Sequence, residues 1–147
     1  NVDLGEFMFG AQRGNLDKYR NILKDIQSGQ CFYCFADLKR SDVDHFIPWS
    51  RYSVDLGDNF VLACKSCNNA KRDILAYVGH LENWVRRNED HRSALDQYFM
   101  EAQLPHDLAG SRMITKWAYT QADVGHAQVW VRGKQTVELD GGWREFV

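Results

Sequence analysis

Apolar residues recur at helical spacing near the start of the chain. The apolar positions in this stretch are Leu16, Tyr19, Ile22, Leu23 and Ile26. Their spacing predicts an amphipathic helix over residues 14–27, with Asn15 as its N-cap and Gly29 as its stop. We expect the apolar stripe to face the core and the helix to lead into the first cysteine pair.

Short apolar runs replace the helical pattern between residues 43 and 63. Residues 43–47 and 60–63 are rich in strand-forming side chains, and Pro48 ends the first run. Residues 50–58 between them carry turn chemistry and predict a loop. A helix is then predicted to begin near residues 64–68 and to continue to about Gly79. The predicted order is strand, loop, strand, helix.

The remaining residues, from 81 onward, predict helices followed by a hairpin. A helical pattern runs to Met100, residues 88–90 interrupt it, and Pro105 ends it. A shorter helix is predicted over 111–122, and strands over 128–131 and 136–139 joined near Gly133. No internal repeat or linker divides residues 1–147, so we expect one α+β domain with a small C-terminal β element. Because Asn1 is not an initiator Met, this domain is also compatible with a fragment of a longer multidomain protein.

Composition and charge narrow the class of protein. The chain is 44% hydrophobic and 26% charged, as in soluble globular proteins, and it lacks the roughly 18 consecutive apolar residues of a membrane span. Its net charge is −2. Nonspecific affinity for nucleic acid grows with the number of phosphates neutralised, so this balance favours an upstream recognition domain or a partner subunit that supplies most of any such affinity. We expect the basic pair Arg86-Arg87 to lie on a solvated face.

Four cysteines form two C-x-x-C pairs, Cys31 with Cys34 and Cys64 with Cys67. A disulfide within either pair would cross-link very little chain, whereas this spacing suits two ligands on one metal ion. The pattern predicts a structural zinc site with all four cysteines as ligands. Zinc-bound thiolates in turn imply a reducing compartment, so we expect a cytoplasmic protein.

Between the cysteine pairs lies a dipeptide, Asp44-His45, that is suited to hydrolysis. An imidazole titrates near neutral pH and can accept a proton from an attacking water, so His45 is the candidate base. Asp44 and the Asn68 amide are hard oxygen donors, which suit Mg²⁺ or Mn²⁺. Neighbours on a strand point to opposite faces, so Asp44 and His45 reach one site only if the strand is twisted or bulged.

Three segments around these residues resemble the HNH endonuclease family. Residues 43–48 are similar to the family's first signature, 59–64 to its middle signature and 67–71 to its last. The resemblance covers about residues 31–75 and implies a ββα-metal (His-Me finger) core of the zinc-binding branch. It implies His45 as base, Asp44 and Asn68 as metal ligands, and Asn59 as the residue that braces the loop. It also implies Lys71 or Arg72 as phosphate contacts. Because Asn69 stands next to Asn68, either asparagine could be the metal ligand of this signature.

This resemblance implies cleavage of DNA phosphodiester bonds, leaving a 5′-phosphate and a 3′-hydroxyl. By analogy, the chain would be the cutting domain of a bacterial or phage restriction, defence or mobility system. Trp49 follows the catalytic segment and is a candidate for stacking on substrate. Two alternatives stay open: a zinc-ribbon-like module that binds nucleic acid or protein without hydrolysis, and a degenerate nuclease. The second is disfavoured because no catalytic position is vacant.

Overall fold

Two short antiparallel sheets and the helices around them form an α+β fold in the computed structural model, which describes the backbone of residues 2–147 and the side chains of residues 14–147. Within those residues there are five α-helices and two 3₁₀ turns. The elements in chain order are α1 (Val2–Ile26), β1 (Asp42–His45), η1 (Gly57–Asn59), β2 (Phe60–Ala63), α2 (Lys65–Lys71), α3 (Val78–Asp90), α4 (Arg92–Glu101), α5 (Leu108–Val124), β3 (Gln128–Arg132), β4 (Gln135–Glu138) and η2 (Gly141–Glu145).

The central unit is the hairpin β1–β2 followed at once by α2, which confirms the predicted order of strand, strand and helix. The strands pair from Asp42 with Ala63 to His45 with Phe60, and this register has no bulge. Every residue of β2 is buried. One face of β2 packs with residues of α1 and α4 such as Leu23 and Phe99, and the other packs with Trp84 and its neighbours. Burial on both faces explains why this strand is a continuous apolar run.

The first helix differs from the prediction at its start. α1 begins at Val2, so Asn15 lies inside the helix and is not an N-cap. Its end agrees with the prediction, because Gly29 has φ +70° and its N–H donates to the Lys24 carbonyl. Left-handed backbone at this position terminates helices and favours glycine.

The predicted helix from the second cysteine pair to Gly79 is wrong, because α2 ends at Lys71. Residues 75–77 are instead extended beside β3: Trp130 N–H donates to the Leu75 carbonyl, and Tyr77 N–H donates to the Trp130 carbonyl. Pairing with a distant strand overrides the local helical spacing of the apolar residues.

Later elements follow the predicted pattern with shifted ends. The break between α3 and α4 falls at His91, next to the predicted 88–90. α5 is longer than predicted and is capped by Asp107, whose side chain accepts from Gly110 N–H. Strands β3 and β4 join at a turn in which Gly133 has φ +50°, as predicted.

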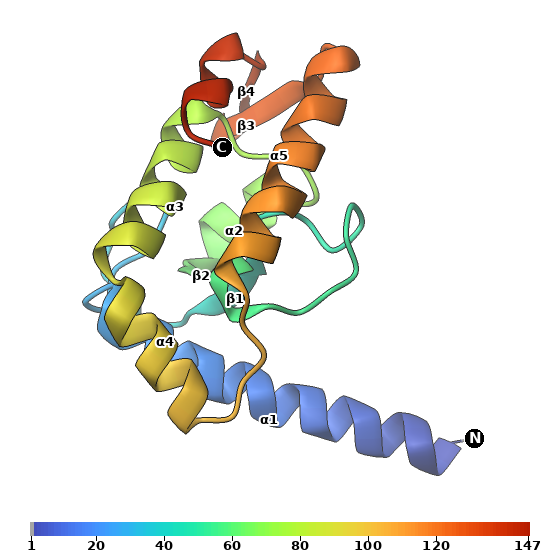
Figure 1. The fold of residues 1–147 in the computed structure, drawn as a ribbon, viewed down its shortest axis with the longest axis vertical. Helices are drawn as coiled ribbons and strands as arrows, with labels where there is room; N and C mark the ends of the chain where they lie inside the picture. The colour runs from blue at the N-terminus through green and yellow to red at the C-terminus, as the bar shows by residue number, and fades with distance from the viewer. Residues whose placement is uncertain (1) are drawn as a thin grey trace.

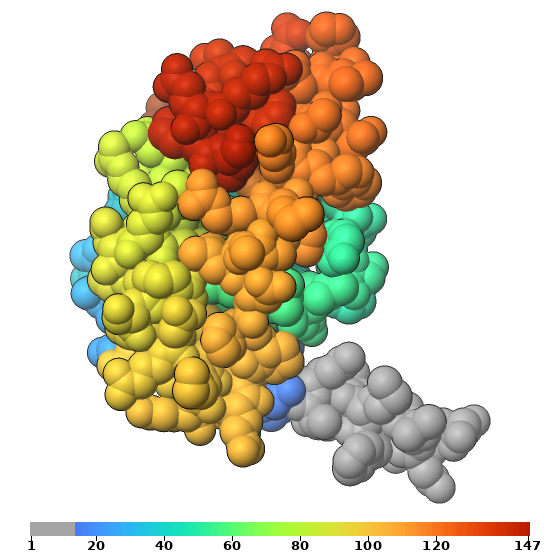
Figure 2. Space-filling model, in the orientation of Figure 1, coloured from blue at the N-terminus to red at the C-terminus, as the bar shows by residue number. Residues whose placement is uncertain are grey.

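In space, α1 lies at one end of the molecule and the β3–β4 hairpin at the opposite end, with the central hairpin and α2 between them (Figure 1). The C-terminal segment packs between α3 and α5, where η2 contacts both helices (Figure 2). None of the helices in residues 2–147 combines the length and apolarity needed to cross a bilayer.

Candidate functional site

The four cysteines meet at one point, as their spacing predicted. All four Sγ atoms lie within 4.8 Å of one another, and none forms a disulfide. Four sulfurs bound tetrahedrally to zinc at about 2.3 Å are separated by about 3.8 Å. The Sγ atoms of Cys34 and Cys64 are 3.9 Å apart. This cluster therefore suggests a zinc site, which joins the knuckle at residues 31–34 to the start of α2.

Backbone amides support the sulfurs. Tyr33 N–H and Cys64 N–H both donate to Cys31 Sγ, at 3.4 and 3.3 Å, and Cys67 N–H donates to Cys64 Sγ at 3.4 Å. Such hydrogen bonds stabilise thiolates, which are the metal-binding form of cysteine.

Asn59 ties the segment after His45 to the start of β2. Its Oδ1 accepts from Ile47 N–H at 2.7 Å, and its Nδ2 donates to the Ile47 carbonyl at 3.0 Å. Phe46 N–H donates to the Asn59 carbonyl at 2.8 Å. The buried amide thus holds both polar groups of Ile47, which is the geometry that a brace for this loop requires.

His45 occupies the last position of β1 with its side chain 24% exposed. Its Nε2 lies 2.7 Å from Asp55 Oδ1. The ring packs on Phe60 at 4.8 Å and faces Trp49 at 5.6 Å between centroids. Trp49 itself is 47% exposed. The site therefore combines an accessible imidazole, a carboxylate and an exposed indole.

Asp55 was not predicted as a site residue. It lies in the loop between the strands, which also holds Asp58, and spacing alone does not distinguish the two carboxylates. The structure distinguishes them, because Asp58 is fully buried in an ion pair with Arg92 at 2.8 Å. The only sequence signal for Asp55 was a carboxylate in the loop after the histidine.

Asp44 points away from His45. Its Oδ2 accepts a hydrogen bond from the Tyr33 hydroxyl at 2.6 Å and lies 3.3 Å from Lys71 Nζ. The side chain is on the buried face of a regular strand, and the residue is 8% exposed. The register of this strand has no bulge that would bring Asp44 and His45 to one point.

The prediction of Lys71 as a phosphate contact is wrong, because its side chain is fully buried. Its ammonium pairs with Asp44 and donates to the His45 carbonyl at 3.2 Å. Burial lowers the pKa of Lys71, and the Asp44 carboxylate opposes that shift. Lys71 neutralises a buried carboxylate and is not available to substrate.

Asn68 faces β1, whereas Asn69 is exposed. The carboxylate that it meets is Asp42, whose Oδ2 accepts from Asn68 Nδ2 at 3.1 Å. Among the side chains of residues 14–147, the cysteines are the only group of three or more histidines, cysteines and acids close enough to share a metal ion. Asp42 and Asn68 bring two hard donors together beside this cluster, while Asp44 is paired with Lys71.

The expectation that Arg87 lies on a solvated face is also wrong. Its guanidinium donates to the Phe60 carbonyl at 2.6 Å and to the Asp58 carbonyl at 2.8 Å. Burial lowers its pKa to about 10, so it remains protonated at neutral pH. Arg87 supports the turn that delivers Asn59 to the loop, whereas Arg86 is exposed as expected.

Comparison with known families agrees with this geometry. The family model described as HNH endonuclease matches residues 31–73, which span both cysteine pairs, β1, β2 and α2. No curated protein and no solved structure gives a significant match to the chain. HNH domains are generally nucleases that act on DNA, and the match confirms the resemblance seen in the sequence. Residues 31–73 of this chain therefore match the HNH endonuclease family model.

Proposed function

We propose that the chain is a metal-dependent endonuclease that hydrolyses DNA phosphodiester bonds. The observation that carries this proposal is the accessible His45–Asp55 pair within the HNH segment, with 2.7 Å between Nε2 and Oδ1. The bracing of the adjacent loop by Asn59 adds support.

The contact with Asp55 supports a distinct role for each ring nitrogen of His45. With Nε2–H donating a hydrogen bond to Asp55, the lone pair of Nδ1 is free to accept a proton from water. Among residues 14–147, none hydrogen-bonds Nδ1. As Nδ1 becomes protonated, the Asp55 carboxylate stabilises the imidazolium. His45 is then the general base, and Asp55 is a positioning residue.

A divalent ion would complete the site. A bound Mg²⁺ or Mn²⁺ would neutralise charge at the scissile phosphate. The resemblance implies Asp44 and Asn68 as its ligands. Because Asp44 is already paired with Lys71, we propose Asp42, which contacts Asn68, as the free carboxylate ligand. Asp42 and Asp44 lie on the same face of β1. Trp49 would stack on substrate beside His45.

The biological setting is a proposal by analogy with the family: the cutting domain of a bacterial or phage restriction or defence system in the cytoplasm. The net charge of −2 supports a recognition domain or subunit elsewhere.

Plasmid cleavage with added Mg²⁺ or Mn²⁺ tests the activity. We expect nicked or linear product that disappears when only the added ion is omitted, so that zinc stays in place. Loss of a general base typically lowers the rate by about 10²- to 10⁴-fold. We therefore expect His45→Ala to cut more slowly by such a factor, and Asp55→Ala to lose less of the cleavage rate. His126→Ala, at an exposed histidine, is the matched control.

Cleavage that persists in His45→Ala would exclude His45 as the base. A folded, zinc-loaded chain that cuts with neither ion would favour the second candidate, a zinc-stapled binding module without hydrolysis. One observation favours that candidate: Lys71 already neutralises Asp44.

A further inference from the structure

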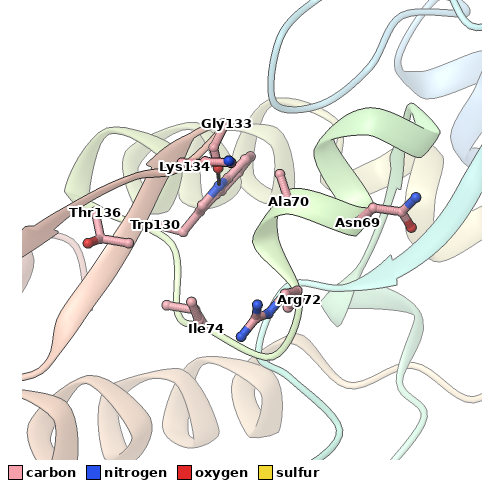
Figure 3. Close-up of a pocket in the computed structure, with 8 residues that line it drawn as sticks. All are labelled: Asn69, Ala70, Arg72, Ile74, Trp130, Gly133, Lys134 and Thr136. Atoms are coloured by element: carbon pink, nitrogen blue, oxygen red, sulfur yellow. Dashed lines mark hydrogen bonds between the residues drawn. The ribbon is translucent and has the colours of Figure 1, made fainter.

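A groove lies outside the candidate active site, between the C-terminal end of α2 and the β3–β4 hairpin (Figure 3). Its volume is about 520 Å³. The residues that line it come from both elements and the segment after α2: Asn69, Ala70, Arg72, Ile74, Trp130, Gly133, Lys134 and Thr136.

The charge of this groove is opposite to that of the whole chain. Its two ionisable residues, Arg72 and Lys134, are both cations, whereas the chain carries −2. Both are exposed, and neither forms an ion pair with any residue in 14–147. Lys65 precedes Asn69 by one turn on the same face of α2. The groove is therefore suited to an anionic ligand.

The backbone at Arg72 gives an independent reason to expect a ligand. This residue caps α2 with φ +54° and ψ −131°, a conformation that favours glycine. Strain of this kind costs roughly 1–3 kcal/mol and tends to persist at functional sites. Because the side chain is exposed, packing does not explain an arginine at this position.

Lys134 lies on the other wall of the groove, in the turn of the β3–β4 hairpin. Trp130 is buried, and its Nε1 donates to the Gly133 carbonyl at 3.0 Å. This contact anchors the turn of the hairpin, so Lys134 projects from a fixed support (Figure 3).

We propose that this groove binds the sugar-phosphate backbone of duplex DNA, with Arg72 and Lys134 on phosphates and Asn69 and Thr136 as polar contacts. The choice of DNA rests on the proposed function. The groove is close to the nuclease site, because Asn69 lines it while its neighbour Asn68 faces β1. The hairpin wall lies outside the HNH segment. Two phosphate contacts predict weak binding with a shallow dependence on salt, in keeping with the net charge.

Fluorescence anisotropy with a short labelled duplex tests this inference. The full zinc-loaded chain carries His45→Ala, and no Mg²⁺ or Mn²⁺ is added. Arg72→Ala and Lys134→Ala should each weaken binding and reduce the slope of log K against log salt by about 1. Arg86→Ala removes the same charge from α3, outside the groove, and should leave the slope unchanged.

Arg72→Gly separates binding from folding. Glycine relieves the backbone strain, so the melting temperature should stay the same or rise, while DNA affinity falls as far as in Arg72→Ala. A melting temperature that falls instead would assign Arg72 a structural role and overturn the proposal.

Two further outcomes would also overturn it: no duplex binding by the parent chain at low salt, or groove variants that match Arg86→Ala. A chain that binds as expected yet never cuts DNA would leave this inference in place and remove only the hydrolytic function.

Discussion

At the scale of single residues, charge and burial decide which side chains reach substrate. Asp44 and Lys71 fit a metal ligand and a phosphate contact in the sequence, yet in the structure they are buried partners at 3.3 Å. Their neighbours His45 and Arg72 remain accessible. Adjacent residues therefore have different roles: Asp44 and Lys71 form the buried ion pair, whereas the residue that follows each of them is a candidate functional group.

The buried pair predicts a large effect of Asp44→Asn on stability. This change leaves the Lys71 ammonium without its counter-charge, so the free energy of unfolding should fall by about 3–5 kcal/mol. Urea denaturation of the zinc-loaded chain measures it. Asp42→Asn, on the same strand but less buried, should have a much smaller effect. The double variant Asp44→Asn with Lys71→Met should recover part of the lost stability. Equal losses of stability in Asp44→Asn and Asp42→Asn would contradict this account.

At the scale of elements, hydrogen bonds hold the loop between β1 and β2 at both of its ends. Asn59 binds Ile47 after the first strand, and Arg87 on α3 binds the carbonyls of Asp58 and Phe60 around the start of the second. Asp55 lies between these anchors. Its approach to His45 therefore depends on the hairpin and on α3.

The two hydrogen bonds of Asn59 predict the result of Asn59→Asp. One carboxylate oxygen can still accept from Ile47 N–H, but the other then faces the Ile47 carbonyl with no proton to share. Unpaired buried polar groups cost about 1–3 kcal/mol, so the melting temperature should fall, together with any cleavage activity. Asn21→Asp makes the same chemical change at an exposed position of α1 and is the control. Unchanged stability in Asn59→Asp would show that the amide does not brace this loop.

At the scale of the whole molecule, the four cysteines join the knuckle at residues 31–34 to the start of α2. The knuckle brings Phe32 and Tyr33 to the cluster that contains Trp84 and Trp130, while α2 follows from the buried strand β2. A metal at the cluster would hold the knuckle, the hairpin and α2 as one unit. The candidate site lies on that unit.

Zinc removal tests this dependence. Because binding energy at structural zinc sites contributes directly to folding, a strong chelator should lower the melting temperature and the helical circular dichroism signal. Adding Zn²⁺ should restore both, whereas adding Mg²⁺ should not. Cys34→Ser should mimic the loss because it removes one of the four ligands. A chain that keeps its stability after verified zinc loss would show that the apolar core suffices.

Sequence pattern alone predicts the central hairpin, most of the helices, the cysteine site and the resemblance to the HNH family. Those features depend on local periodicity and short spacing, which persist whatever packs around them. Packing of the elements against one another is what brings Asp55 to His45, buries Lys71 against Asp44, and places α2 and the β3–β4 hairpin around a basic groove. These contacts join residues distant in sequence, and local pattern does not encode which of several similar side chains will meet when the helices and strands pack.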